Sequence, residues 1–279
     1  SGSFFSTSLV EPQQKVNFVD LYIPANPFES LANNVVPAVV LFSIFIGVAL
    51  IGIKEKQGII HPLSILSEAL MKITKYIVYL TPIGVFAISA SAAGTMTVEE
   101  FGKLQVYFIA FLLGVLLLTF LILPLMVGAL TPFKYRDILG LTKDALITGF
   151  TTGNLFIILP VLVQNCKDLF EKYRLEHPEI NSSVDIIVPV SFNFPNLGKL
   201  LMLLFILFAG WFYGNPVSLE RYPNFIFSGL FSFFGSVDVA IPFMLDLMRI
   251  PADAFQLYLV TGIINGRLAT LLAAMHLVA

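Results

Sequence analysis

The sequence predicts an all-α integral membrane protein in which two helical hairpins re-enter the bilayer and one transmembrane helix is broken. The first observation is composition: 57% of the 279 residues are hydrophobic and 12% are charged, and the mean hydropathy is +0.87. Such a chain lacks the charged surface of a soluble domain. The second is a series of apolar runs of about 20 residues, the length that crosses a bilayer. The third is that three runs in the C-terminal half are interrupted by glycine, proline or small polar residues.

Composition also argues against several classes of function. The formal net charge is −2 and no basic cluster is present, so nothing indicates a nucleic-acid partner. The one cysteine, Cys166, cannot build a disulfide framework or a cysteine metal site. No nucleophile with its base, phosphate loop or metal-ligand cluster stands out, so we expect neither an enzyme nor a metalloprotein. Residues 1–15 lack the charged start and apolar core of a signal peptide, and we expect a piece of a longer chain.

Charge placement orients the elements in the membrane, because short cytoplasmic loops collect lysine and arginine. The apolar runs that we expect to cross lie at 34–53, 70–93, 105–130, 186–213 and 255–279. The loop between the first two is basic and is placed inside, the loop with Glu99 and Glu100 is placed outside, and the basic residues after 130 return the chain to the inside.

The interrupted run 145–165 is predicted to be a re-entrant hairpin. If it crossed fully, the basic loop with Lys167, Lys172 and Arg174 would lie outside and break the charge rule. An ordinary crossing helix is the alternative. For the second such run, 225–248, which is interrupted at Gly235-Ser236, the flanking loops are nearly neutral and the rule decides nothing.

The run 186–213 is predicted to unwind at Pro195-Asn196-Leu197-Gly198, because proline removes a backbone donor. A simple proline kink is the alternative. Unwound backbone at membrane depth is tolerated against protein or a water-filled cavity, and three interrupted segments together indicate a transporter binding site near the bilayer midplane.

Two cations lie inside apolar segments. Lys199 is the one charge between Ile186 and Gly214, and burying it in lipid costs roughly 3 kcal/mol or more. It requires a partner such as Asp238, carbonyls freed by the break or an anionic substrate; snorkelling to the interface is the alternative. Arg267 is predicted to bind a substrate carboxylate with its planar guanidinium, and a permanent salt bridge to Asp238 or Asp246 is the alternative.

Four stretches resemble the dicarboxylate/amino acid:cation symporter family, which has the glutamate-transporter fold. They are 23–50 (IPANPFESLANNVVPAVVLFSIFIGVAL), 79–90 (YLTPIGVFAISA), 143–150 with 159–161 (KDALITGF and LPV), and 188–201 (VPVSFNFPNLGKLL). The resemblance covers that fold from just before its fourth transmembrane helix to its eighth.

The resemblance implies a division of the chain. Residues 1–33 would be an extracytoplasmic lead-in, 34–104 scaffold helices that trimerise, and 105–279 a moving transport domain. Within that domain the resemblance implies a hairpin at 145–165 that opens to the cytoplasm, a broken helix, a hairpin at 225–248 that opens outside, and a final amphipathic helix.

The resemblance also implies a substrate site and a cation site, from which this chain departs. The first hairpin tip would hold substrate through Thr152, Gly153 and Asn154, where the family has a serine-rich stretch. Of the family's polar residues on the last helix, Arg267 remains; Asp238, which stands where the family has small residues and proline, and Asn265 complete the predicted substrate set. The equivalents of the family's cation site are Asn193, Asn196, Gly198 and Lys199, but the family's carboxylate is Leu197 and its threonine is Lys199.

An ammonium offers no oxygen ligand to sodium. We therefore expect Lys199 to stand in for a bound cation. Sodium and a proton stay open as coupling ions, and no other cofactor is indicated.

The sequence thus predicts a secondary transporter for a small organic anion, a dicarboxylate or an amino acid, working by an elevator-type motion. We expect a multi-pass protein of the bacterial cytoplasmic membrane, a homotrimer, with a fused or separate solute-binding domain as a further partner. Two alternatives are a receptor or regulatory membrane domain derived from the transporter fold, motivated by the apolar replacement of ligands, and an anion channel.

Overall fold

The computed structural model describes residues 22–23, 26–33, 35–78, 97–175 and 177–279, together with 83–84, 86–87, 90–91 and 94. Within these ranges the regular elements are helices, which confirms the all-α prediction for this part of the chain. Most of the stretch 79–90 and most of the predicted lead-in 1–33 lie outside the described residues. The chain separates into two compact units, 1–56 and 57–279.

The first unit contains α2 (Pro27–Ala32) and α3 (Val36–Leu50). Asn26 begins α2 because its side chain accepts hydrogen bonds from the backbone N–H groups of Phe28 and Glu29, at 3.0 and 3.4 Å. Proline stands in the first turn of both helices, where its missing N–H is not needed. Helix α3 lies within the predicted run 34–53.

The second unit begins with α4 (Gln57–Val78). Its start corrects the prediction of a run at 70–93, because the helix begins 13 residues earlier, in a segment that is less apolar. The apolar criterion missed these residues since the helix starts with the polar stretch Gln57-Gly58 and contains His61 and Pro62.

Helices α6 (Val98–Leu117) and α7 (Leu123–Leu130) form one continuous rod with the π-helical turn η1 (Leu118–Ile122) between them. Thr97 and Glu100 cap its start reciprocally. The π turn precedes Pro124, which has no N–H to give to the carbonyl of Phe120. The Tyr135 hydroxyl donates to that carbonyl instead, at 2.6 Å.

Two helix–turn–helix pairs match the interrupted runs. The first is α8 (Tyr135–Thr152) with α9 (Leu155–Lys172), joined at Gly153 in the left-handed conformation, and the second is α13 (Tyr222–Ser232) with α14 (Val237–Leu247), preceded by the short turn η2 (Leu219–Arg221). Both pairs are longer than the runs that predicted them. Both ends of the first pair and the start of the second extend into polar sequence that the apolar criterion does not count.

The broken helix consists of α10 (Pro178–Ser191), α11 (Leu197–Leu201) and α12 (Leu203–Phe212). The chain leaves helical geometry after Ser191 and resumes it after Asn196. The predicted break at 195–198 overlaps this interruption at Pro195 and Asn196 and is wrong for Leu197 and Gly198, which are helical because Asn196 caps α11. Helix α10 begins eight residues before the predicted run, because its first turns, from Pro178 to Asp185, are polar.

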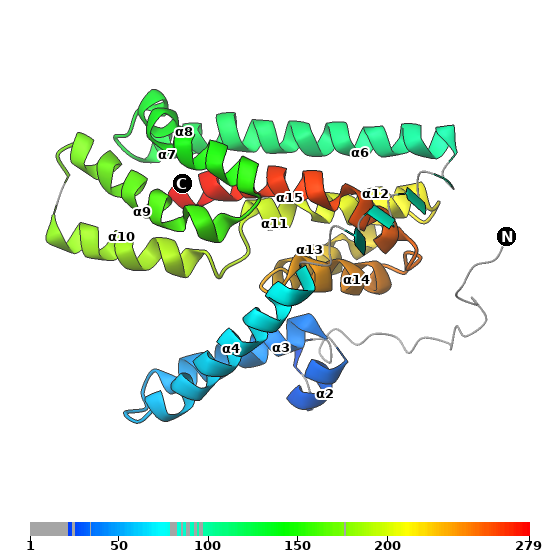
Figure 1. Ribbon diagram of the computed structural model, residues 1–279, viewed down its shortest axis with the longest axis horizontal. Helices are drawn as coiled ribbons and strands as arrows, with labels where there is room; N and C mark the ends of the chain where they lie inside the picture. Colours follow the sequence, from blue (N-terminus) through cyan, green and yellow to red (C-terminus); the bar gives the residue numbers. More distant parts are fainter. Residues whose placement is uncertain are drawn as a thin grey trace. The chain divides into compact units, whose positions relative to one another are not determined.

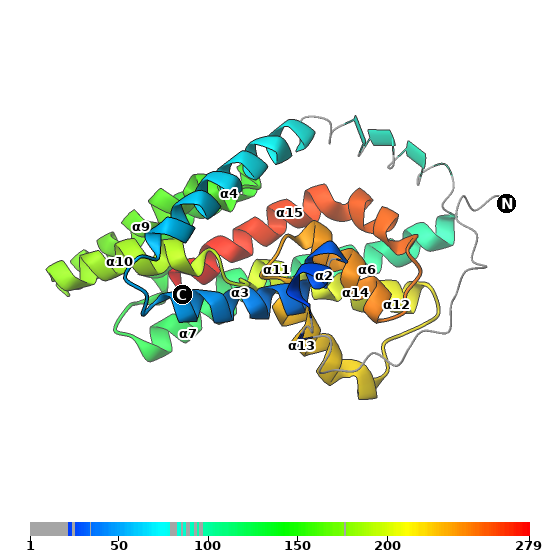
Figure 2. The ribbon, with the colours of Figure 1, turned by 90° about the horizontal axis from the view of Figure 1, so that it is seen from below.

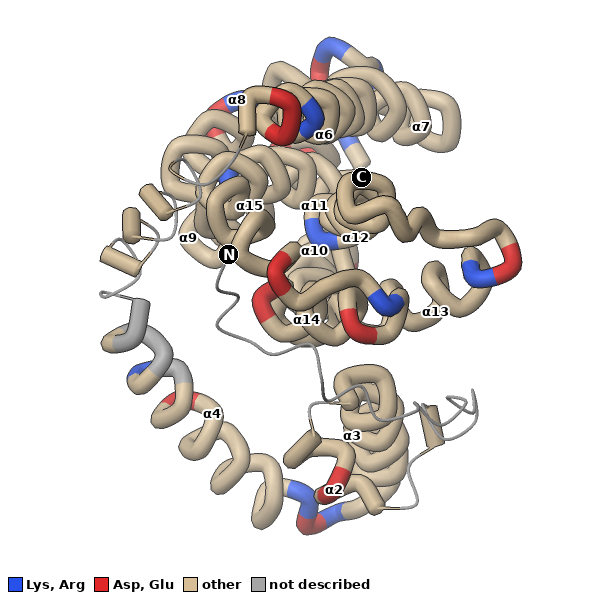
Figure 3. The backbone as a smooth tube through the Cα atoms, turned by 90° about the vertical axis from the view of Figure 1, so that its right-hand side faces the viewer, with Lys and Arg blue, Asp and Glu red and all other residues tan. Residues whose placement is uncertain are grey.

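Helix α15 (Ala254–Val278) runs through the middle of the bundle that α6–α14 form (Figures 1 and 2) and packs on α6, α8, α9, α10, α11 and α14. Residues 270–275 are buried consecutively, so its C-terminal half is enclosed on all sides and the expectation of an amphipathic helix is wrong there. Long stretches of the bundle carry no charge (Figure 3). Among the described residues, two helices are long and apolar enough to cross a membrane, Val98–Leu130 and Ala254–Val278.

Candidate functional site

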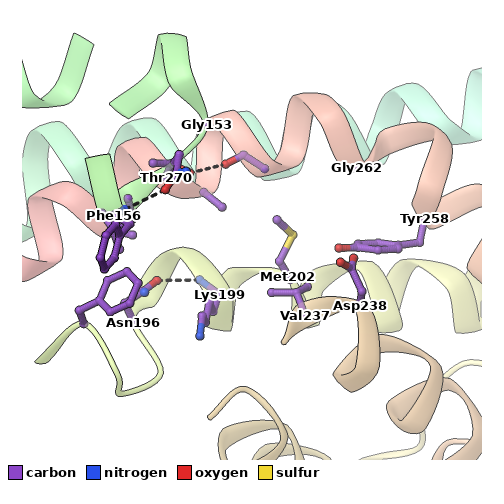
Figure 4. Close-up of a pocket in the computed structure, with 16 residues that line it drawn as sticks. Gly153, Phe156, Asn196, Lys199, Met202, Val237, Asp238, Tyr258, Gly262 and Thr270 are labelled. Atoms are coloured by element: carbon purple, nitrogen blue, oxygen red, sulfur yellow. Dashed lines mark hydrogen bonds between the residues drawn. The ribbon is translucent and has the colours of Figure 1, made fainter. Parts of the chain in front are cut away.

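A cavity of about 380 Å³ lies where the tips of both hairpins and the break of the broken helix meet the middle of α15. Each element contributes its own group of lining residues, and Figure 4 shows those that it labels gathered between α15 and the broken helix. The first hairpin gives 153–156, the broken helix gives Phe192, Asn196, Lys199 and Met202, the second hairpin gives Val237 and Asp238, and α15 gives Tyr258, Gly262, Gly266, Ala269, Thr270 and Ala273.

The first hairpin tip reaches the cavity because glycine allows a tight turn. Gly153 has φ +63° and its N–H donates to the carbonyl of Gly149. Asn154 then begins α9, its side chain accepting from the N–H of Phe156 at 2.9 Å. Gly149 lets the arms close on α15, since an added Cβ would lie 2.9 Å from Ile158 Cδ1 and 3.5 Å from Thr270 Cγ2.

The break of the broken helix is held by buried polar contacts. Asn196 is 2% exposed, and its side chain accepts from the N–H of Lys199 at 3.0 Å, which caps α11. The N–H of Leu197 donates to Nδ1 of His276 on α15, at 3.4 Å. The packing is closest at Gly198, where an added Cβ would lie 2.0 Å from the carbonyl oxygen of Ala269.

Lys199 is half-buried, and its ammonium donates to the carbonyl oxygens of Phe233 and Gly235 at 3.4 and 3.5 Å. Of the partners that the sequence offered, the structure thus selects backbone carbonyls, but those of the second hairpin tip and not those freed by the break. Within the described part of the chain, no carboxylate lies within 4.0 Å of this ammonium.

Asp238 stands in the first turn of α14, after the cap Ser236, whose hydroxyl accepts from the N–H of Asp238 at 3.2 Å. Its carboxylate lies beside the hydroxyl of Tyr258 (Figure 4). The cavity therefore contains one carboxylate and one ammonium that are not paired with each other.

The remaining predicted site residues lie beside the cavity. Arg267 is exposed on α15, and its Cγ would lie 3.4 Å from a Cβ added at Gly153, so its stem packs at the first hairpin tip. Its alternative salt bridges to Asp238 or Asp246 are not among the ion pairs of the described residues. Thr152 donates to the carbonyl of Thr148 at 2.7 Å within the tip.

Two predicted residues point elsewhere. Asn265 is fully buried against α6, and its amide donates to the Tyr107 hydroxyl at 2.7 Å and to the Thr261 hydroxyl at 2.9 Å. Asn193 is exposed, and its amide donates to the carbonyl of Pro189 at 3.3 Å. Neither side chain lines the cavity.

Sequence reasoning missed the face that α15 presents to the cavity. Tyr258, Gly262, Gly266, Ala269 and Ala273 recur at helical spacing, so they share one face. Small residues at this period let a ligand or a neighbouring backbone approach, and the pattern was a usable signal. The prediction for this helix rested instead on the charge of Arg267, which lies on an adjacent face of α15.

A bundle with two helical hairpins and a broken helix around one cavity that holds charged side chains has the architecture of a secondary membrane transporter. The profile of the sodium:dicarboxylate symporter family matches residues 3–278, and the chain belongs to this family. Family membership and the apolar helices support an integral membrane protein, of a family of symporters and not of enzymes.

Similar proteins carry transporter names. The chain is 31% identical over 152 residues to a proton/glutamate-aspartate symporter of Bacillus subtilis (54% of this chain, 36% of the relative). It is 25% identical over 180 residues to a C4-dicarboxylate transport protein of the same organism (64% and 41%). It is 29% identical over 169 residues to an L-cystine uptake protein of Shouchella clausii (57% and 34%). The chain thus spans less than half the length of these relatives.

Proposed function

We propose that the protein is a secondary transporter that moves a small organic anion, a dicarboxylate or an amino acid, across the membrane. The observation that carries this is the convergence of helix N-termini on one cavity. Helices α9, α11 and α14 all begin at its wall: the caps Asn154 and Asn196 line the cavity, and so does Val237, the first residue after the cap Ser236. Helix N-termini carry partial positive charge, which favours a carboxylate ligand.

The charged side chains of the cavity favour an amino acid over a dicarboxylate. Lys199 adds to the positive charge of the helix ends, whereas Asp238 supplies one negative charge next to Tyr258. A substrate ammonium group would pair with Asp238, and a second substrate carboxylate would be repelled by it. Arg267, beside Gly153, is the candidate for a second carboxylate contact at the cavity's edge.

We further propose that the two hairpins are re-entrant and that the region 105–279 moves past a scaffold formed by 34–104. Both ends of the first hairpin lie together: the N–H of Lys134 before α8 donates to the Tyr173 hydroxyl after α9, at 2.6 Å. Such a closed base suits two arms that enter and leave on one side. The same proposal includes a homotrimer in the bacterial cytoplasmic membrane, as a multi-pass protein.

Uptake into proteoliposomes tests the transporter proposal. Labelled aspartate, glutamate, succinate and cystine are offered with a sodium gradient, with a proton gradient and with neither. Saturable accumulation of at least one substrate supports the proposal. Ligand binding without uptake would instead support a receptor or regulatory domain, and a conductance that does not depend on substrate would support an anion channel.

A further inference from the structure

The tip of the second hairpin presents backbone oxygens to a cation. Helix α13 ends at Ser232, and Phe233 and Gly235 follow it, so their carbonyls lie past the last turn of the helix. Carbonyl groups at a helix C-terminus have no intrahelical partner and carry the negative end of the helix dipole. Both of these oxygens face Nζ of Lys199, at 3.4 and 3.5 Å.

The ammonium has no competing acidic partner in the described chain. Asp238 lies on the same hairpin and lines the same cavity, yet no ion pair joins the two. Half-buried and bound to carbonyl oxygens alone, the ammonium is in the type of environment that a dehydrated monovalent cation occupies in proteins, where carbonyls replace its water shell.

We propose that the carbonyl oxygens of Phe233 and Gly235 form a monovalent-cation site, which the protein fills permanently with its own Lys199. The tethered cation joins the broken helix to the second hairpin tip, and the tip therefore stays on α11 without a dissolved ion. The link itself follows from these contacts. Its consequence for uptake, that substrate movement needs no sodium at this position, rests on the proposed transport function.

Two substitutions of Lys199 separate the loss of its charge from the access of a dissolved cation to the carbonyl oxygens. Lys199→Ala leaves the two carbonyl oxygens facing open space at the negative end of α13, and a small dissolved cation can enter. Lys199→Met also removes the charge but retains most of the side-chain volume, so it blocks entry. The two variants share the lost charge and differ in access to the site.

Accessibility of the hairpin tip is the readout. Val237 is half-buried, lines the cavity in the first turn of α14, and becomes exposed if the tip leaves α11. Val237→Cys is labelled with maleimide in a Cys166→Ser background, because Cys166 is the one native cysteine. Rates are compared in choline, sodium, potassium and ammonium chloride without substrate.

With Lys199 present, the labelling rate is expected to be the same in all four salts. In Lys199→Ala it rises about tenfold in choline, which corresponds to ~1.4 kcal/mol or one charge-assisted hydrogen bond, and falls again in at least one of the other salts. In Lys199→Met it rises and stays high in every salt.

A sodium- or potassium-dependent rate with Lys199 present would overturn the proposal, as would a Lys199→Ala rate that no salt lowers. If Lys199→Ala does not fold, the salt series on the protein with Lys199 still tests the proposal, because a sodium- or potassium-dependent labelling rate would overturn it. The labelling needs no uptake, so its failure is distinct from failure of the transport assay.

Discussion

Gly198 sets how closely the broken helix approaches α15. An added Cβ would lie 2.0 Å from the carbonyl oxygen of Ala269 and 3.1 Å from Cβ of Ala273, and the first of these atoms belongs to helix backbone that cannot rotate away. Helix α11 would have to move outward, and the cap at Asn196 would move with it. The residue that the sequence marks as a helix breaker thus acts mainly by being small.

We expect Gly198→Ala to lower the free energy of unfolding by ~1–3 kcal/mol or more, the cost of overpacking a close contact. The matched control is Gly140→Ala on α8, where an added Cβ meets nothing within 4 Å. That change is expected to be neutral or to stabilise by up to ~1 kcal/mol, because alanine favours helix. Thermal unfolding of the purified protein measures both; equal midpoints for the two variants would contradict the close contact.

Arg267 tests whether substrate reaches the edge of the cavity. Arg267→Ala should raise the KM for a substrate with two carboxylates about tenfold or more, since a charge-assisted hydrogen bond contributes ~1.5–3 kcal/mol. Arg136→Ala is the control, because Arg136 is also exposed but lies in the first turn of α8, away from the cavity lining. An unchanged KM in Arg267→Ala would remove this residue from the substrate site.

Asp238 should determine the choice between amino acids and dicarboxylates. Asp238→Asn keeps the side-chain shape but removes the negative charge, so the KM for an amino acid should rise about tenfold while that for succinate stays equal or falls. Asp246→Asn, on the same helix but outside the cavity lining, should change neither value. Parallel uptake of labelled aspartate and succinate measures the ratio, and an equal effect on both substrates would contradict the assignment.

At the scale of elements, the base of the first hairpin is fixed by a small polar cluster. Asp137 at the start of α8 accepts from Lys172 and from the Tyr173 hydroxyl, both at 2.8 Å, and the same hydroxyl accepts from the N–H of Lys134. The hydrogen bonds of Lys172 and Tyr173 hold the pKa of the Asp137 carboxyl below its ordinary value of 3.8. The ionised Asp137 carboxylate therefore stabilises the closed hairpin base, and the closed base stabilises the ionised form of Asp137.

This linkage gives the hairpin base a pH dependence. Because the folded pKa is lowered, the contribution of Asp137 to stability is fully present above the ordinary pKa of 3.8 and is lost as the pH falls through the folded value. Asp137→Asn should lower the melting temperature at neutral pH and make the acid-side decline shallower. Asp144→Asn, exposed on the same helix, should leave the curve unchanged, and a native-like acid limb in Asp137→Asn would contradict the linkage.

The existence of the elements could be predicted better than their ends. The interrupted runs, the break before Gly198 and the long last helix follow from apolar length and from glycine and proline positions, which are local features. The early start of α10 could not, because its first turns are polar and it begins at the cap His177. The early start of α4 could not, because polar residues, Gly58 and Pro62 interrupt its apolar pattern. The π turn could also be predicted only in part. Pro124 marks its position, but the hydrogen bond that stabilises it comes from Tyr135, 11 residues later.

The site could be predicted in part: the sequence indicates which residues belong to it better than it indicates where their side chains point. Gly153, Asn154, Asn196, Lys199 and Asp238 line one cavity, as a binding-site prediction requires. Asn265 belongs to the predicted substrate set, yet its helical position turns it toward Tyr107. The partner of Lys199 is a backbone atom on another hairpin, and sequence patterns carry no information on such a contact.

At the scale of the whole molecule, the membrane arrangement of the first hairpin determines whether the cavity can form inside the bilayer. The polar cluster at its base brings the start of α8 and the end of α9 together, and the basic residues of both ends favour the cytoplasmic side. The tip at Gly153 then lies at cavity depth, between the broken helix and α15. A crossing helix at 145–165 would place the two ends on opposite faces.

Arg136→Cys and Glu171→Cys, each in a Cys166→Ser background, test this arrangement because both positions are exposed at the base of the hairpin. A membrane-impermeant maleimide should label both in inside-out vesicles and neither in right-side-out vesicles. Glu220→Cys, in the turn before α13, should give the opposite result, since the second hairpin is expected to open outside, and it serves as the control for vesicle orientation. If Arg136→Cys and Glu171→Cys are labelled from different faces, the α8–α9 pair crosses the membrane and its tip cannot carry substrate contacts at the midplane.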